Sequence, residues 1–248
     1  MRLSYIRSTC DPYYQPACDV YVTAFRAEQR APVDDLVDLV KRGIGHAIAF
    51  VDESDGREEF IGASYIVPTP QYLWILFLAM TPASRGQGYG TRALEMLAAE
   101  FPQRALLLEI EAVLSEARNA DQRQRRERFY LRNGFSYTGL STDEPDGRFD
   151  FLIRDGEIDL DQMREVMEST VGTAMLDRWQ MVLIQQPGAE RECAGENDPK
   201  NHEDLMLDND CRAADRAVGD ESRTADSDDK NPEFSDRGDD SSERAWHD

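Results

Sequence analysis

The sequence predicts a mixed α/β (α+β) domain in which helices cover both faces of one mixed sheet. Two observations lead to this prediction. Segments with the apolar pattern of strands and segments with helical spacing follow one another in the order β-α-α-β-β-β-α-β-α-β-β. The run from Tyr72 to Met80 is almost wholly apolar, which is typical of a strand buried on both faces.

The first half of the chain contains four expected strands and two expected helices. Apolar residues alternate or run together in the strands, and they recur every three or four positions in the helices. Gly43 and the turn-forming residues 52–56 mark two of the boundaries. The expected elements are a strand at 2–7, helices at 16–29 and 33–42, and strands at 46–51, 60–67 and 72–80.

The second half alternates helices and strands. One helix places Ala93, Leu94 and Leu97 on a single face. Another is polar, and i,i+4 charge pairs such as Asp121 with Arg125 support it. The expected elements are a helix at 90–101, a strand at 105–110, a helix at 119–133, strands at 135–139 and 148–154, a helix at 159–169 and a strand at 179–185.

Charge divides the chain into two parts. The formal net charge is −21, which argues against nucleic acid or an anionic membrane as the main partner. Residues 188–248 hold 20 acidic and 8 basic residues, with few apolar ones. Such a segment cannot bury enough apolar surface to offset the entropy of ordering. We therefore expect a folded domain at 1–187 and a disordered acidic tail at 188–248.

Apolar run length, N-terminal charge and cysteine spacing disfavour several classes of protein. The longest apolar run is far shorter than the roughly 20 residues that a membrane-spanning helix needs. Arg2 and Arg7 interrupt the N-terminus, and no apolar core of a signal peptide follows. The four cysteines form no CxxC pair, so we expect neither a disulfide framework nor a metal site. These features favour a soluble, cytoplasmic protein.

The most informative segment is the glycine turn that follows Tyr72–Met80. Its sequence is Arg85-Gly-Gln-Gly-Tyr-Gly90, and helical spacing begins at Thr91. A strand that feeds a glycine turn at a helix N-terminus presents backbone N–H groups to a phosphate or pyrophosphate. The glycine spacing fits neither GxGxxG nor GxxxxGK[ST]. On its own, the segment is also compatible with an ordinary tight turn.

A second segment, with Phe129-Tyr130 followed by Gly134-Phe135, completes the pattern. Together the two segments resemble the GNAT superfamily of N-acetyltransferases. The family's donor motif has Gln or Arg, two residues, Gly, one residue and then Gly or Ala, which Arg85, Gly88 and Gly90 satisfy. The resemblance implies a mixed, mostly antiparallel central sheet. The chain departs from the family where Asn-x-x-Ala is common, because Arg123 and Arg126 occupy those positions.

The resemblance implies acetyl-CoA as the co-substrate. In the family, backbone N–H groups of the turn hold the pyrophosphate, and strand backbone pairs with the pantetheine arm. We expect the three glycines of the turn to permit the close approach through their missing Cβ and positive φ. The implied contacts are Leu78, Ala79 and Met80 for pantetheine, and Arg85, Gly86, Gln87, Gly88, Tyr89, Gly90 and Thr91 for the pyrophosphate.

Three residues are candidates for proton transfer. By its position in the family motif, Tyr130 would protonate the departing thiolate. Its alternative role is that of a core tyrosine with its hydroxyl at the surface. Glu109 and Glu111 share one face of a strand because they are two residues apart. Either could accept the proton of the amine, or both could be structural carboxylates that pair with the arginines at 123–128.

The leading hypothesis is an N-acetyltransferase that moves an acetyl group directly from acetyl-CoA to a primary amine in a ternary complex. The acceptor would be a small molecule or a peptide or protein, and a homodimer is compatible with the sequence. The alternative is a non-catalytic acyl-CoA-binding or regulatory module whose acidic tail recruits a partner. Transfer of a longer acyl group is a further alternative. Trp74, Tyr65 and Phe77 are expected in the core rather than in an acceptor pocket.

Overall fold

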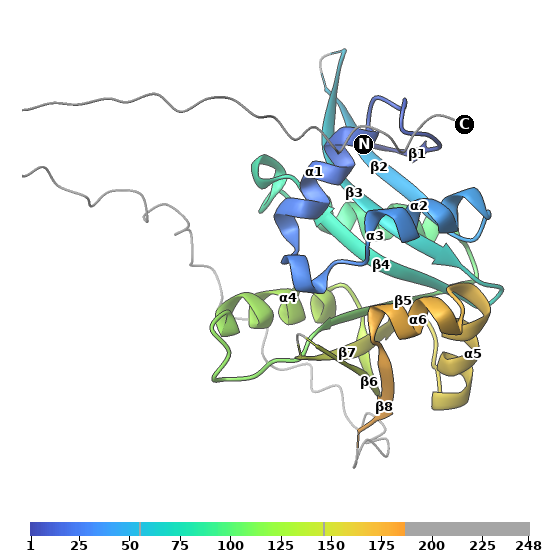
Figure 1. Ribbon diagram of the computed structural model, residues 1–248. Coiled ribbons are helices and arrows are strands. Elements are labelled where there is room, and N and C mark those ends of the chain that lie inside the picture. Colours follow the sequence, from blue (N-terminus) through green and yellow to red (C-terminus); the bar gives the residue numbers. More distant parts are fainter. Residues whose placement is uncertain (55, 146, 187–248) are drawn as a thin grey trace, which may run out of the picture. The chain divides into compact units, whose positions relative to one another are not determined.

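The computed structural model of the chain describes residues 1–54, 56–145 and 147–186 (Figure 1). Within these residues, eight strands form one sheet in the order β1-β2-β3-β4-β5-β7-β6-β8. The predicted tail at 188–248 lies outside them. The strands are β1 (Arg2–Ile6), β2 (His46–Ser54), β3 (Arg57–Pro68), β4 (Tyr72–Met80), β5 (Ala105–Glu111), β6 (Ser136–Glu144), β7 (Gly147–Arg154) and β8 (Val182–Gln185).

The sheet is mixed and mostly antiparallel, which confirms the predicted fold class. Strands β4 and β5 pair in parallel, and the other neighbouring pairs in the described residues are antiparallel. Short 3-10 turns occur at η1 (Ala27–Gln29) and η2 (Pro82–Ser84). The α-helices are α1 (Tyr14–Ala24), α2 (Val33–Lys41), α3 (Tyr89–Glu100), α4 (Ala120–Arg132), α5 (Leu160–Thr170) and α6 (Thr173–Trp179).

Two apolar clusters cover the two faces of the sheet. One cluster joins α1, α2, α5 and α6 to one face, and the other joins α3 and α4 to the opposite face. Figure 1 shows α1 and α2 in front of β3 and β4, with α3 behind them. Side chains of β5 alternate between the clusters, because Leu107 packs in the first and Leu106 in the second. No helix in the described part of the chain is long and apolar enough to cross a membrane.

Several predicted elements differ from the observed ones, and the strand expected at 135–139 continues as β6 to Glu144. The helix expected at 16–29 ends at Ala24, because Phe25 is extended, and η1 follows as a separate turn. The strand expected at 179–185 is wrong at its start, since Trp179 is the last residue of α6 and β8 begins only at Val182. Helix α6 has seven residues, fewer than two full turns. A segment so short shows too little periodicity to be recognised as a helix.

The core of α3 gives a direct test of this packing. Leu94 is fully buried between α3 and the sheet. We expect Leu94→Ala to lower the free energy of unfolding by about 2–5 kcal/mol, because it removes apolar contacts and leaves a cavity. Leu131→Ala in α4 is the matched control, since Leu131 is 41% exposed. Urea denaturation followed by circular dichroism measures both, and equal losses would contradict the assignment of Leu94 to the core.

Candidate active site

Strand β4 contains a β-bulge at Leu76. Tyr65 of β3 opposes Phe77, whereas Ile66 opposes Ile75, so Leu76 is the extra residue. A bulge changes the alternation of side chains along a strand and is common beside active sites. Here it turns two successive side chains to the same side, because Leu76 and Phe77 both line one cavity.

Strands β4 and β5 diverge at the bulge. Their parallel ladder begins with Tyr72 and Ala105 and ends, within the described residues, with Ile75 and Leu108. Beyond this point β4 continues against β3, and Glu109–Glu111 continues against β7. The inner edges of two diverging strands present backbone N–H and C=O groups that an extended ligand can pair with.

The glycine turn connects β4, through η2, to the start of α3. Gly86 and Gly88 have φ values of +75° and +79°, a left-handed conformation that other residues rarely adopt. Gly88 is the N-cap of α3 and offers no side chain to the free N–H groups there. The bond from the Arg92 N–H to the Gly88 carbonyl, at 3.2 Å, closes the first turn of the helix. The preceding N–H groups lie at the positive end of the helix dipole.

Side chains of the turn bond to groups close by. Arg85 donates to the Met80 carbonyl at 3.3 Å, and Gln87 donates to a backbone carbonyl of η2 at 2.6 Å. The Tyr89 hydroxyl donates to the Asp52 carboxylate at 2.9 Å. Residues 85–88 are exposed, and Thr91 is half-buried in the first turn of α3. The turn therefore presents an accessible backbone to a ligand.

Gly90 serves packing rather than backbone conformation. Unlike Gly86 and Gly88, it does not have a positive φ. A Cβ at Gly90 would lie 3.0 Å from the Phe129 ring. The missing side chain lets α3 approach α4. The two sequence motifs are thus in direct contact.

Tyr130 is buried on α4, with 8% of its surface exposed. Its ring makes edge contacts with Phe129 and Phe135, at centroid distances of 5.0 and 5.4 Å. Burial raises the pKa of the Tyr130 hydroxyl, and the positive charge of Arg126 offsets part of that rise. The phenol is therefore protonated at neutral pH, as a proton donor must be.

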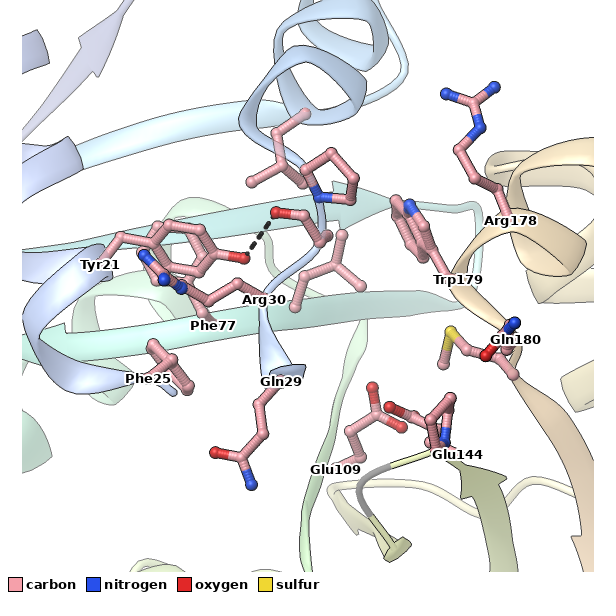
Figure 2. A pocket seen from close by; sticks show the side chains of 16 residues that line it. Tyr21, Phe25, Gln29, Arg30, Phe77, Glu109, Glu144, Arg178, Trp179 and Gln180 are labelled. Carbon is pink, nitrogen blue, oxygen red and sulfur yellow. Dashed lines mark hydrogen bonds between the residues drawn. The ribbon is translucent and has the colours of Figure 1, made fainter. Parts of the chain in front are cut away.

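A cavity of about 270 Å³ lies where β4 and β5 diverge (Figure 2). It is bounded by the segment from α1 to α2, the bulge of β4, the end of β6 and the end of α6. Its lining combines the aromatic side chains of Tyr21, Phe25, Phe77 and Trp179 with the carboxylates of Glu109 and Glu144.

Hydrogen bonds fix the aromatic walls of this cavity. The Tyr21 hydroxyl donates to the Ala31 carbonyl at 3.1 Å, the bond drawn in Figure 2. The indole N–H of Trp179 donates at 2.8 Å to Asp35, which is buried in α2 and also pairs with Arg178. The end of α6 is thereby held against α2.

Glu109 projects into the cavity from β5. Its carboxylate accepts a hydrogen bond from the Thr142 hydroxyl at 3.1 Å, and the same hydroxyl lies 3.0 Å from Glu144. In Figure 2 the carboxylates of Glu109 and Glu144 lie side by side. Burial, together with the charge of Glu144, raises the pKa of Glu109 to about 8, although the Thr142 bond lowers it.

The family model for the Acetyltransferase (GNAT) family matches residues 9–135, just over half of the chain. The chain belongs to the GNAT acetyltransferase family. It is therefore an acyltransferase, and the resemblance noted from the sequence is confirmed. The match contains β4, the glycine turn, β5 and Tyr130. Thr142, Glu144 and α6 lie beyond it.

The chain is similar to several solved structures, and the first of them shares its fold. A Bacteroides thetaiotaomicron protein described as a GNAT acetyltransferase is 24% identical with a TM-score of 0.55, over 69% of this chain and 98% of its own. An aminoglycoside 6'-N-acetyltransferase complexed with coenzyme A is 17% identical with a TM-score of 0.49, over 64% and 100%. Escherichia coli ElaA is 17% identical with a TM-score of 0.43, over 62% and 100%. No curated protein matches the chain.

Glu111 lies in a charged cluster on the edge of this GNAT domain, and its side chain is 4% exposed. Arg123 and Arg126, which stand where the family often has Asn-x-x-Ala, contact its carboxylate at 3.1 and 2.9 Å. Asn119 and Gln29 also donate to it, at 3.1 and 2.9 Å. Burial alone would raise the pKa of Glu111, but these hydrogen bonds and the two arginines outweigh it and lower the pKa. These are the surroundings of a structural carboxylate.

Sequence reasoning missed several residues of the GNAT site. Thr142 and Glu144 come from β6, which is two strands away from β5 in the sheet, and no local pattern signals that proximity. Trp179 comes from the unpredicted helix α6. Trp74, Tyr65 and Phe77 are core residues as expected, and Phe77 also lines the cavity because the bulge redirects it.

The Glu111 cluster predicts a pH-dependent loss of stability. We expect Glu111→Gln to lower the free energy of unfolding at pH 7 by roughly 3 kcal/mol, because it leaves the half-buried Arg123 and Arg126 without their countercharge. The folded pKa of Glu111 lies below its ordinary value of 4.5. Its contribution is therefore present above about pH 4.5 and is lost as pH falls through the lowered pKa.

Denaturation curves between pH 3 and pH 7 test this expectation. The variant should lose less stability on acidification than the wild type. Glu165→Gln is the control, since Glu165 is exposed on α5. A Glu111→Gln curve parallel to that of the wild type would contradict the proposed role of the cluster.

Proposed function

We propose that this protein is an N-acetyltransferase that transfers an acetyl group from acetyl-CoA to a primary amine of a small molecule, peptide or protein. Transfer takes place directly, in a ternary complex. The observation that carries the proposal is the divergence of β4 and β5, with a glycine turn following one strand and a carboxylate-lined cavity between them. The acetyl donor and the amine acceptor would thus have separate binding sites that meet where β4 and β5 diverge.

The donor half binds acetyl-CoA along β4 and the turn. The pyrophosphate accepts hydrogen bonds from N–H groups of residues 85–91, where the helix dipole favours negative charge. The pantetheine amides pair with the inner edge of Leu78–Met80, which β5 leaves unpaired. The name of the coenzyme A complex given above supports this assignment by analogy with that enzyme. A backbone N–H near Met80 stabilises the developing oxyanion.

The acceptor half is the cavity beside Glu109. An amine reaches it as an ammonium ion and must lose a proton before its nitrogen can attack the thioester carbonyl. Glu109 accepts that proton, since its pKa of about 8 is close to the pH at which a base works best. Glu111, held between arginines with a lowered pKa, is less suited to this role. We therefore assign the base to Glu109.

Tyr130 completes the reaction as general acid. The bond between nitrogen and the acetyl carbon forms, the carbon–sulfur bond breaks, and the thiolate takes the phenolic proton. The raised pKa of Tyr130 keeps that proton available, and the second proton of the amine restores it. Acetylated amine, free coenzyme A and one proton for solvent are the products.

The remaining parts of the proposal concern organisation. Residues 1–187 form the catalytic domain, and 188–248 form an acidic tail, which accounts for much of the net charge of −21. The same charge favours a substrate amine over nucleic acid, and a cytoplasmic location is part of the proposal.

The first test is turnover and its dependence on Tyr130. With acetyl-CoA and a panel of diamines, amino sugars and lysine peptides, at least one amine should accelerate coenzyme A release, measured by mass spectrometry. A thiol reagent would also react with Cys10, which is exposed. We expect Tyr130→Phe to lower kcat roughly 10²- to 10⁴-fold, because it removes the acid and keeps the ring. Calorimetric affinity for coenzyme A should not change.

Two results count against the assignment. Unchanged turnover in Tyr130→Phe would exclude the hydroxyl as the acid. Coenzyme A binding without turnover on any amine would favour a non-catalytic acyl-CoA-binding module.

The second test is the pH profile of Glu109. Because only the carboxylate accepts a proton, kcat/KM of the wild type should rise with pH and level off above about 8. Glu109→Gln should lower kcat/KM roughly 10²- to 10⁴-fold and abolish that rise. The same measurement on Glu111→Gln is the comparison, and a larger loss there would reassign the base to Glu111.

A further inference from the structure

One hydroxyl group lies between the two carboxylates of the cavity. The Thr142 Oγ1 is 3.1 Å from Glu109 Oε2 and 3.0 Å from Glu144 Oε1. A hydroxyl has a single proton to donate, so it satisfies only one ionised carboxylate. Both contacts can be hydrogen bonds when one of the two carboxyl groups is protonated. That carboxyl then donates to the Thr142 hydroxyl oxygen, and the hydroxyl donates to the other carboxylate. Because Thr142 is fully buried, solvent water does not compete for its hydroxyl.

We propose that Thr142 and Glu144 form a proton exit for Glu109, and this inference rests on the function proposed above. After Glu109 takes a proton from the acceptor ammonium, its carboxyl donates that proton to Thr142 Oγ1. The hydroxyl proton of Thr142 passes to the Glu144 carboxylate, and Glu144 releases it to water. Glu109 is then a carboxylate again. One proton has moved, and no other bond has changed.

The charged groups around Glu109 are compatible with a proton shared by the pair. Glu144 faces it from β6, and Tyr21 and Arg30 line the cavity from the segment between α1 and α2. Arg178 at the end of α6 is already paired with Asp35. The negative charge of Glu144 raises the pKa of Glu109, and the Thr142 hydroxyl lowers it. Glu144 and Thr142 thus shift the pKa of Glu109 in opposite directions.

The position of the pair along β6 provides a matched control. Thr142 and Glu144 are two residues apart and share one face of the strand, whereas Asp143 between them is exposed. Asp143→Asn removes the same charge as Glu144→Gln from an adjacent position. Residues 142–144 also lie outside the part of the chain that the family model matches.

The experiment measures the titration of Glu109 with and without turnover. The full chain, labelled with ¹³C at the glutamate carboxyl, is titrated by NMR without acetyl-CoA, and kcat/KM is measured over the same pH range. We expect Glu144→Gln to shift both midpoints to lower pH and Thr142→Val to shift both to higher pH. Thr142→Val should also lower the plateau of kcat, because the exit is blocked. Thr142→Ser, which keeps the hydroxyl, and Asp143→Asn should titrate as the wild type does.

Opposite shifts in the two variants together with a lower kcat plateau in Thr142→Val support the inference, and an unchanged plateau in Thr142→Val overturns it. Unshifted midpoints in both variants, or equal shifts in Thr142→Ser and Thr142→Val, overturn it while leaving wild-type turnover as evidence for the transferase. Failure of the proposed function has a different signature, namely no turnover by the wild type on any amine.

Discussion

The site depends on the point at which β4 and β5 stop pairing. A parallel ladder that continued past Ile75 and Leu108 would consume the backbone groups that an extended donor needs. The bulge at Leu76 ends that continuity and turns Leu76 and Phe77 together into the cavity. The β3–β4 ladder resumes at Phe77 after the bulge, and the β5–β7 ladder is continuous across the same stretch. The sheet is therefore opened locally without exposing a strand that has no partner.

Two glutamates on one face of β5 acquire opposite properties from their surroundings. Glu109 lies beside a like charge in a partly apolar cavity, which raises its pKa. Glu111 lies among arginines and amide donors that lower its pKa. Environments that push the pKa values of two carboxyl groups apart in this way favour one as a proton acceptor and the other as a structural anion. Glu111 also joins η1, β5 and α4 through Gln29 and Arg126, so it stabilises elements on both sides of the site.

The sequence allowed β4 and the glycine turn to be predicted much better than the cavity beside them. Strand Tyr72–Met80 and the glycine turn are contiguous, and each has a local signal in apolar pattern or glycine spacing. The contact between Gly90 and Phe129 depends on how α3 packs on α4, so no local pattern predicts it. Thr142 reaches Glu109 through the register of three strands, which no single stretch of sequence encodes. Helix α6 was missed because seven residues carry little periodicity.

This asymmetry has a physical consequence for substrate choice. In the function proposed above, backbone groups and glycines hold the donor, and such groups bind the same coenzyme whatever the neighbouring side chains are. The cavity proposed for the acceptor is instead built from side chains of distant segments, among them Trp179 and Glu144, which lie beyond the matched residues 9–135. The buried Asp35 orients Trp179 by accepting its indole N–H, which reduces the ordering that this wall would need on binding. Under that proposal the aromatic wall selects the acceptor by shape and the carboxylates select it by protonation state, so β6 and α6 are the elements expected to determine acceptor choice.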